Sequence, residues 1–323
     1  MARRRATHPP VRELQLATLA DAAPGGDAWL HEQKFDGYRI VAVLERGTAR
    51  LLSRRFKDWT AAFPTVAAAV AQLGAERAVI DGEVAVVLPD GRTSFQALQN
   101  VDDGADLAYF VFDLLALDGE DVAALPLEQR KARLKQLVKP GRGEPGVIRY
   151  SDHVVGRGAE FFALACRRGL EGIVSKRRDK PYLPGRGMAW LKIKCLQRQE
   201  LVIGGFTDPA GSRVGLGALL VGYYDHDRLV YAGKVGTGFS HRTLVELRGL
   251  LAPLERTASA FSPEPPRAWT GGQRHWVAPE LVAEIAFSEW TDDSRLRHPS
   301  FQGLRRDKAA REVIRETPAR TAR

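Results

Sequence analysis

The sequence contains little cysteine. Only two cysteines, Cys166 and Cys195, occur among 323 residues, and they do not form a C-x-x-C pair. Structural zinc sites usually need several such ligands at close spacing, so a zinc-stabilised domain is not expected. A disulfide scaffold is not expected either, which fits a protein of a reducing compartment.

Long apolar segments are also lacking. The first ten residues, "MARRRATHPP", are basic, but no apolar segment of the kind found in secretory signals follows them. No apolar run approaches the roughly 20 residues that a membrane-spanning helix needs. We therefore expect a cytoplasmic protein without a membrane partner.

Several common catalytic signatures are missing as well. The chain has no G-x-x-x-x-G-K-[ST], no G-x-S-x-G and no H-E-x-x-H. The glycine-rich stretches "VGLGALLVG" and "VGTGF" do not match G-x-G-x-x-G opening a helix, so we interpret these glycines as turn or strand residues. A P-loop NTPase, an α/β-hydrolase and a zinc protease are therefore not supported.

The sequence does have a strongly basic balance. Its formal net charge is +9 and its isoelectric point is about 9.7. A charge of this size favours a polyanionic partner, most often nucleic acid. The length favours two domains over one.

Hydrophobic patterns divide the chain near residues 196–200. Residues 1–27 are expected to be irregular or extended, and 139–146 to form a loop. Before the boundary, the patterns predict the strands "YRIVAVLE", "AVIDGEVAVVL" and "LAYFVFDLL", and helices over 61–74, 126–138 and 158–169. After it, short strands at even spacing predict a small β-barrel or sandwich, with a helix over 241–251 and a strand pair near 274–290.

Charged residues interrupt several of the apolar strands. Glu83 lies among valines, Asp113 ends "YFVFD", and Lys176 follows "EGIVS". Lys192 and Lys194 alternate in "WLKIK", so they share one face of a strand. Each could be a charge at a strand end, but together they predict a cleft suited to a nucleotide triphosphate and its metal.

Lys34, in "HEQKFDGYRI", is the candidate nucleophile for such a cleft. A lysine amine attacks an α-phosphorus only when it is deprotonated, which desolvation or nearby cations favour. Arg39, Lys192, Lys194 and a bound Mg²⁺ could supply those cations, and carboxylates such as Glu171 could hold the metal. The reaction would transfer a nucleotidyl group to Lys34 and release pyrophosphate.

The motifs of this cleft resemble those of the covalent nucleotidyltransferases, which include DNA ligases, RNA ligases and capping enzymes. "KFDGYR" at 34–39 is similar to K-x-D-G-x-R. The remaining family motifs follow in order: "SRR" at 53–55, "DGEVAV" at 81–86, "YFVFDLL" at 109–115, "EGIVSK" at 171–176, "WLKIK" at 190–194 and "RHPSFQGLRRDK" at 297–308.

Within this superfamily the chain is most similar to bacterial ATP-dependent DNA ligases, in particular the ligase domain of the ligase D group. "EGIVSKR", "WLKIKC" and "RHPSFQGLR" carry this likeness. The resemblance implies an α+β fold, in which an adenylation domain (1–196) has antiparallel sheets with flanking helices and an OB-fold β-barrel occupies 197–323.

The resemblance also implies roles for individual residues. Lys34 would carry AMP as a covalent intermediate, with ATP as cofactor and Mg²⁺ or Mn²⁺ as metal. Glu32 would accept from the adenine amino group, with Phe112 and Val174 on the two faces of the base. The other implied assignments are phosphate or ribose contacts for Arg39 and Arg54, a ribose or metal contact for Glu83, nucleotide binding for Lys176, metal ligation for Asp36 and Glu171, α-phosphate binding for Lys192 and Lys194, and β,γ-phosphate contacts for Arg305, Asp307 and Lys308.

Some alternatives stay open at this stage. Arg55 would replace Arg54 in the site if the strand register slipped by one residue, and Phe112 and Val174 could be plain core. The implied function is sealing of nicked duplex DNA in repair or end joining by a nucleoid-associated monomer, with end-joining proteins as possible partners. The rivals are an RNA ligase, a capping enzyme, and a non-catalytic OB-fold protein that binds nucleic acid.

Overall fold

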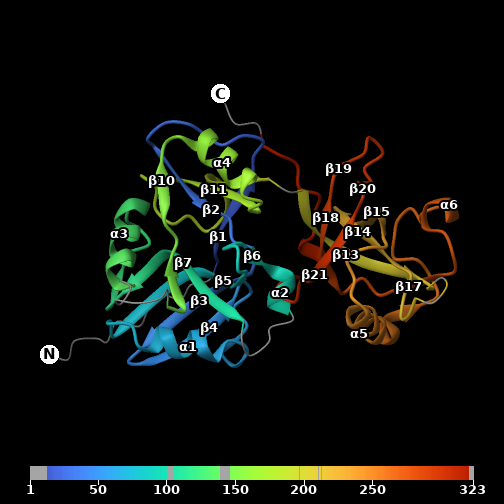
Figure 1. The fold of residues 1–323 in the computed structure, drawn as a ribbon, viewed down its shortest axis with the longest axis horizontal. Coiled ribbons are helices and arrows are strands. Elements are labelled where there is room, and N and C mark those ends of the chain that lie inside the picture. Colours follow the sequence, from blue (N-terminus) through green and yellow to red (C-terminus); the bar gives the residue numbers. More distant parts are fainter. Residues whose placement is uncertain are drawn as a thin grey trace. The chain divides into compact units, whose positions relative to one another are not determined.

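The computed structural model describes residues 13–99, 105–138, 146–195, 197–209, 211 and 213–319. It divides into two compact units (Figure 1), unit 1 (Met1–Cys195 with Pro318–Arg323) and unit 2 (Leu196–Thr317). The end of the chain belongs to unit 1 because the amide of Ala319 donates to the carbonyl of Leu19 at 2.8 Å. The sequence pattern gave no sign of this return.

Unit 1 contains a sheet of seven strands among the described residues. The predicted strands "YRIVAVLE", "AVIDGEVAVVL" and "LAYFVFDLL" form its centre, as their alternation indicates. In the part of this sheet that the structure describes, β7 and β9 pair in parallel and the other neighbouring strands pair antiparallel. The order is β4-β3-β5-β7-β8, with β6 beside β5 and β9 beside β7. The bounds are β3 Tyr38–Glu45, β4 Thr48–Ser53, β5 Arg77–Val87, β6 Thr93–Ser94, β7 Asp106–Leu117, β8 Glu120–Asp121 and β9 Ile148–Tyr150.

A five-stranded sheet faces it in the same unit. Its order is β1-β12-β11-β2-β10, with bounds β1 Gln15–Leu19, β2 Trp29–Gln33, β10 His153–Val155, β11 Gly172–Arg177 and β12 Gly185–Lys194. β1 pairs with β12 in parallel. Part of the segment expected to be irregular or extended is therefore a strand, which forms because the edge of β12 offers it backbone partners.

Short helices cover the two sheets of unit 1 (Figure 1). The predicted helices are found as α1 (Pro64–Ala71), α3 (Leu127–Leu137) and α4 (Gly158–Arg167), together with a short α2 (Phe95–Gln99). α1 begins at a proline, which suits the first helical turn because that turn needs no amide partner. The expected loop at 139–146 lies outside the described residues except for Gly146.

The core of unit 1 has three layers of apolar side chains. One fills the face of the seven-stranded sheet that α1 covers, and one packs α4 on the five-stranded sheet. The third lies between the two sheets, where Val41, Val79 and Leu115 meet Tyr182 and Trp190. This central layer holds the two sheets at a fixed separation, on which any site between them depends.

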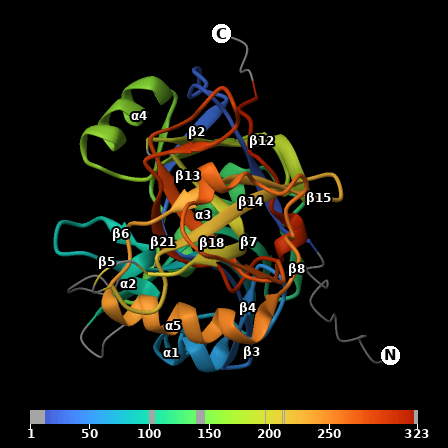
Figure 2. The ribbon, with the colours of Figure 1, turned by 90° about the vertical axis from the view of Figure 1, so that its right-hand side faces the viewer.

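Unit 2 is built around a second seven-stranded sheet (Figure 2). The order is β15-β14-β13-β17-β16, and β18 joins β13 to β21. The bounds are β13 Gln197–Thr207, β14 Ala218–Asp225, β15 Arg228–Val235, α5 His241–Leu251, β16 Glu255–Arg256, α6 Arg267–Thr270, β17 Arg274–Val277, β18 Val282–Phe287, β19 Glu289–Trp290, β20 Leu296–Arg297 and β21 Ser300–Leu304. The predicted short strands and the helix over 241–251 are therefore present.

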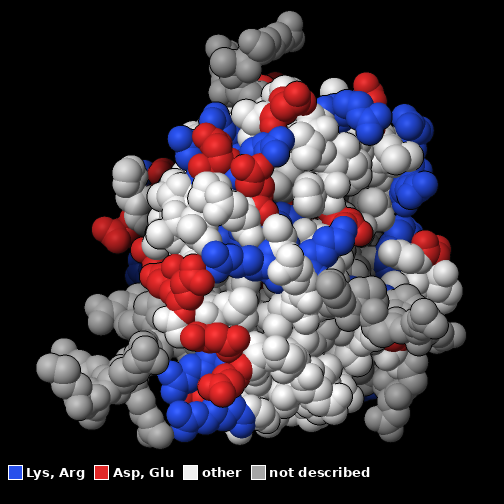
Figure 3. Space-filling model, turned by 90° about the vertical axis from the view of Figure 1, so that its left-hand side faces the viewer, with Lys and Arg blue, Asp and Glu red and all other residues white. Residues whose placement is uncertain are grey.

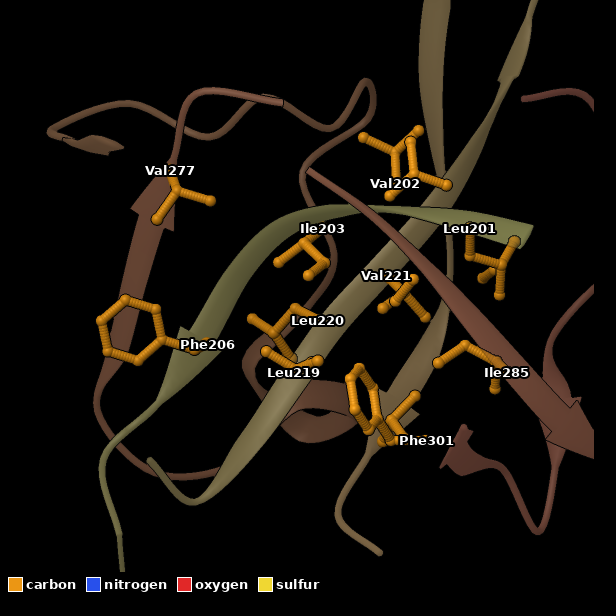
Figure 4. Close-up of a cluster of buried hydrophobic side chains, with 14 of the residues drawn as sticks. Leu201, Val202, Ile203, Phe206, Leu219, Leu220, Val221, Val277, Ile285 and Phe301 are labelled. Atoms are coloured by element: carbon orange, nitrogen blue, oxygen red, sulfur yellow. The ribbon is translucent and has the colours of Figure 1, made fainter. Parts of the chain in front are cut away.

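A single apolar cluster fills the interior of unit 2. Figure 4 shows Ile203, Leu220, Val221, Ile285 and Phe301 converging from several strands. The long strand β13 pairs with β14 on one side and with β17 and then β18 on the other, which lets one strand serve both parts of the sheet. Antiparallel strands around one apolar cluster agree with the small β-barrel or sandwich that the sequence predicts for this region.

The two cysteines correct an expectation from the sequence. Cys166 in α4 and Cys195 after β12 form a disulfide, with their Cα atoms 5.1 Å apart. Their number and spacing gave no sign of pairing, because the approach of α4 to the end of β12 is a tertiary feature. Within the described residues, no helix has both the length and the apolar character needed to cross a membrane.

Candidate functional site between the two sheets of unit 1

Lys34 lies immediately after β2, at the end of the five-stranded sheet. Its amide donates to the carbonyl of Gly172 at 3.0 Å, and its Nζ forms an ion pair with both carboxylate oxygens of Glu171 at 2.6 and 2.7 Å. The Lys34 side chain is 23% exposed, whereas that of Glu171 is 5% exposed. The amine is therefore held by a buried carboxylate while part of its side chain remains accessible.

Two glycines of the motifs make close backbone contacts around Lys34. A Cβ on Gly172 would lie 2.1 Å from the carbonyl oxygen of Ile193, and one on Gly37 would lie 2.1 Å from that of Val84. Real side chains cannot make such contacts, so both positions require glycine. The close backbone approach expected at Gly37 is confirmed.

The five-stranded sheet presents its polar residues in register. Val174 pairs with Glu32 on one side and with Lys192 on the other. Side chains of directly paired residues lie on the same face, and so do residues two apart. The face that carries Glu32, Val174 and Lys192 therefore also carries Lys176 and Lys194, and the expected shared face of the two β12 lysines is present.

The seven-stranded sheet of unit 1 contributes a second row, formed by Arg39, Glu83 and Phe110. Arg39 donates to both oxygens of Asp81 at 2.6 and 2.9 Å, to the carbonyl of Gln15 at 2.7 Å and to the Tyr182 hydroxyl at 3.2 Å. Burial opposes its charge, but the attraction of Asp81 raises the pKa of Arg39 above its ordinary value. Arg39 thus ties β3 to β5, to β1 and to the segment of Tyr182.

Phe112 lies half-buried in the layer between the two sheets. Its ring meets Trp190 edge-on at a centroid distance of 6.0 Å. The amine of Lys176 lies 4.3 Å from the Phe112 centroid, and the Arg39 guanidinium lies 5.4 Å from it. Two cations therefore lie over the ring, where the electron-rich π-face attracts positive charge. Stacking of adenine on Phe112, with Val174 opposite, stays a prediction.

Glu32 lies at the centre of a buried charged cluster. Its carboxylate accepts from Lys131 Nζ at 2.7 Å, Lys176 Nζ at 2.9 Å and Ser151 Oγ at 3.0 Å. Burial alone would raise the pKa of Glu32, but the charges of Lys131 and Lys176 lower it overall. Burial in turn lowers the pKa of Lys176.

Sequence reasoning missed Lys131 and Ser151. They lie outside every motif, and Lys131 is separated from Glu32 by 99 residues. The one available signal is that Lys131 lies between the apolar residues Leu127 and Leu134 of its helix, a signal that many solvated lysines share.

The predicted metal ligands occupy different environments. Glu171 is the partner of Lys34, and buried Asp36 accepts from the amide of Phe95 at 3.2 Å. Among the residues that the structure describes, no group of three His, Cys, Asp or Glu side chains is placed to hold a metal ion. Metal ligation by Asp36 and Glu171 therefore stays a prediction.

The choice between Arg54 and Arg55 was expected to depend on strand register, but neither residue lies in a strand. β4 ends at Ser53, so both arginines follow the strand and lie in a turn. Arg54 is half-buried and Arg55 is exposed. Strand register therefore does not decide between them.

The last motif lies in unit 2. Arg305 donates to both oxygens of Asp307 at 2.8 and 2.9 Å and to Glu284 at 2.9 Å, and Lys308 donates to Glu200 at 2.8 Å. These charges are paired within unit 2, and their contacts with a triphosphate stay predictions.

Residues 176–198 form a basic segment, with eight Lys and Arg residues against one acidic residue, Asp179. Arg177 pairs with Asp179, and Arg178 pairs with Glu128. On the face drawn in Figure 3, acidic and basic side chains lie close to one another, and neither sign covers the face alone. Because Glu128 lies outside residues 176–198, its ion pair with Arg178 offsets one positive charge that the composition of this segment leaves unbalanced.

Two families of known proteins match the chain. The family described as "ATP dependent DNA ligase domain" matches residues 15–194, and "ATP dependent DNA ligase C terminal region" matches residues 212–308. The matched segments contain the site of unit 1 and the last motif of unit 2, respectively.

Individual relatives agree with the family matches. The chain is 42% identical over 311 residues to the multifunctional non-homologous end joining protein LigD of Pseudomonas aeruginosa, covering 94% of this chain and 36% of that protein. It is 40% identical over 291 residues to the LigD repair protein of Mycobacterium tuberculosis, covering 89% of this chain and 37% of that protein. The chain thus spans about a third of the length of these relatives.

A solved structure is also similar. The structure described as mycobacterial DNA ligase D complexed with ATP and MES aligns with a TM-score of 0.70 at 37% identity, covering 94% of this chain and 98% of that one. Together with the two family matches, which cover most of the described residues, this likeness shows that the chain belongs to the ATP-dependent DNA ligase family.

Proposed function

We propose that the chain seals nicks between a 5′-phosphate and a 3′-hydroxyl in duplex DNA, using ATP. The observation that carries this proposal is the placement of Lys34. This lysine is partly accessible, is held by Glu171, and lies at the end of the sheet whose polar face carries Lys192 and Lys194. In this proposal residues 1–196 form the adenylation domain and residues 197–323 the OB-fold domain.

The first step follows from the chemistry of Lys34. Its Nζ would attack the α-phosphorus of ATP, so that an N–P bond forms while the bond to pyrophosphate breaks. Only the neutral amine has the lone pair for this attack, so Lys34 must lose a proton and its contact with Glu171. Lys192 and Lys194 would bind the oxygens of the α-phosphate, where negative charge develops.

Two further transfers would complete the reaction. The AMP moves from Lys34 to the 5′-phosphate of the nick, and the 3′-hydroxyl then attacks that phosphate and releases AMP. Mg²⁺ or Mn²⁺ would supply charge neutralisation for the phosphates, and phosphate oxygens would be among the ligands of the ion.

The remaining assignments are part of the same proposal. Glu32, Phe112, Val174 and Lys176 would surround the adenine, and a second group would contact ribose, phosphates or metal: Asp36, Arg39, Arg54, Glu83, Glu171, Arg305 and Lys308. The names of the relatives support a role in end joining. We propose a monomer of the bacterial cytoplasm, associated with the nucleoid, that works with end-joining proteins.

Labelling of the protein tests the proposal. Incubation with α-labelled ATP and magnesium, followed by denaturing electrophoresis, should give a labelled protein band that nicked duplex DNA discharges. Lys34→Arg, which keeps a positive charge next to Glu171, should abolish the band. Lys57→Arg, at an exposed position, should retain it.

Three results would contradict the proposal. An unlabelled wild-type protein would exclude the covalent mechanism. Labelling by GTP but not by ATP would favour a capping enzyme, and a label that nicked RNA but not nicked DNA discharges would favour an RNA ligase.

A further inference from the structure

Two adjacent cations of α3, Arg130 and Lys131, are buried although the rest of the helix is amphipathic. Arg130 is 0% exposed and Lys131 is 1% exposed. Long charged side chains are seldom buried to this extent unless they are paired. The partners of these two residues therefore explain why α3 carries them.

Each cation binds a carboxylate of a different sheet. Arg130 donates to both oxygens of Asp113 at 2.7 and 2.8 Å, and Asp113 follows Phe112 directly in β7. Lys131 donates to Glu32 at 2.7 Å and to the carbonyl of Ser151 at 2.9 Å. One turn of helix thus connects the strand of Phe112 to the strand of Glu32, and it fixes the separation of these two side chains.

The hydrogen bonds of Glu32 leave it little freedom. An ionised carboxylate has about four lone-pair positions, and three of them accept from Lys131, Lys176 and Ser151. Oε1 accepts only from Lys131 among these three, so the remaining position lies on the oxygen that Lys131 orients. A carboxylate fixed in this way is an acceptor at one defined point.

Such an acceptor distinguishes the two purines. Adenine presents an amino group at the position where guanine presents a carbonyl oxygen. An ionised Glu32 would accept from the amino group and repel the carbonyl, whereas a protonated or misoriented Glu32 would lose this preference. The charge of Lys131 helps to keep Glu32 ionised, in line with the lowered pKa of that carboxyl, which burial alone would raise.

We propose that Lys131 is a positioning residue for nucleobase selection, which acts by holding the Glu32 carboxylate as an oriented acceptor and thereby favours ATP over GTP. This inference rests on the proposed function, because it concerns the nucleotide that Lys34 takes up. Lys131 does not itself contact the base in this proposal.

The test compares covalent labelling with α-labelled ATP and α-labelled GTP in the full chain. Lys131→Met should reduce the ratio of ATP to GTP labelling rates by about tenfold or more. Lys135→Met is the matched control, because Lys135 lies one turn further along α3 and over the same Tyr150 ring. Lys135 is 65% exposed and pairs with surface Asp152, so its variant should keep the wild-type ratio.

A double-mutant cycle separates positioning from general structural damage. If Lys131 acts through Glu32, Lys131→Met should change the ratio little further in a Glu32→Gln background. If Lys131→Met does not fold, as judged by circular dichroism, Lys131→Gln replaces it, since glutamine can still donate to Glu32 but carries no charge.

Results that contradict the role of Lys131 differ from results that contradict the proposed function. A folded variant with an unchanged ratio, or effects of Lys131 and Glu32 that multiply, would overturn the inference. Absence of labelling in the wild-type protein with either nucleotide would instead contradict the proposed function.

Discussion

At the scale of single residues, the site depends on charges that find buried partners. Arg39 and Asp81 are 42 residues apart, and Lys34 and Glu171 are 137 apart. Their attraction is strong only because surrounding side chains exclude water, which also makes each charge expensive to leave alone. Mutations at these positions should therefore affect folding as well as chemistry.

The pair of Arg39 and Asp81 gives the first prediction. Asp81 is fully buried and also accepts from the Tyr182 hydroxyl at 2.8 Å. Asp81→Asn should lower the free energy of unfolding by about 3 to 5 kcal/mol, because it leaves a buried guanidinium without its counter-charge. Urea denaturation measures this change. Asp90→Asn, which breaks an exposed pair with Arg92, should have little effect, and equal effects of the two variants would contradict the argument.

His31 gives a pH-dependent prediction. It is fully buried in β2, the strand that Lys34 follows, and its Nδ1 forms a hydrogen bond with Ser175 Oγ at 2.8 Å. Burial lowers the pKa of His31 from 6.5 to about 4. Because the pKa of His31 is lower in the folded protein, the unfolded state binds the proton first as the pH falls. The contribution of neutral His31 to the free energy of unfolding is therefore complete above pH 6.5 and decreases as the pH drops toward 4. The loss should total about 3 kcal/mol.

The measurement is the difference between wild type and His31→Gln in unfolding free energy across this pH range. The difference is needed because burial also lowers the pKa of His153, so the variant keeps part of the acid sensitivity. If the wild type and the variant lost stability in parallel from pH 6.5 to 4, neutral burial of His31 would not be responsible.

At the scale of elements, strands and helices could be predicted well, and their partners could not. The periodicity of "YRIVAVLE" and of residues 126–138 is a local property, so β3 and α3 were found. The sequence predicted residues 1–27 to be irregular or extended, and it could not show that β1 is a paired strand, because its partner β12 lies more than 160 residues later. In α3 the apolar residues indicated the buried face, but Arg130 and Lys131 are buried on it through contacts with distant carboxylates.

The site was predicted to a similar extent. The motif "WLKIK" placed Lys192 and Lys194 on one face of a strand correctly, because it is continuous in sequence. Short motifs could not show that Glu171 pairs with Lys34, that Arg39 pairs with Asp81, or that Lys131 completes the environment of Glu32. These pairings depend on which strands and helices become neighbours in the folded chain, and a continuous motif does not contain that information.

The disulfide between α4 and β12 gives a prediction at this scale. It closes a loop between residues 29 apart in sequence, which restricts the unfolded chain and stabilises the fold by about 2 to 4 kcal/mol. Reduction by dithiothreitol should lower the melting temperature, and a variant with both Cys166→Ser and Cys195→Ser should melt at the reduced value with or without the reductant. Two alkylatable thiols in the untreated, denatured protein would show that the bond is absent in solution.

At the scale of the whole molecule, the chain has separate hydrophobic cores. The cluster of unit 2 draws its residues from Leu201 to Val313, whereas the clusters of unit 1 draw theirs from Leu14 to Ile193. Among the described residues, each apolar cluster draws its members from one unit alone. Domains with their own cores commonly unfold as separate cooperative units.

Calorimetry should therefore resolve two unfolding transitions. The effect of removing the disulfide shows which of the two transitions belongs to unit 1. Because both cysteines belong to unit 1, the double serine variant should lower the melting temperature of one transition and leave the other in place. ATP should raise the same transition that the serine variant lowers, since ligands stabilise the unit that binds them. A single transition that shifts as a whole in the serine variant would show instead that the two cores unfold together, and the units would then be parts of one cooperative structure.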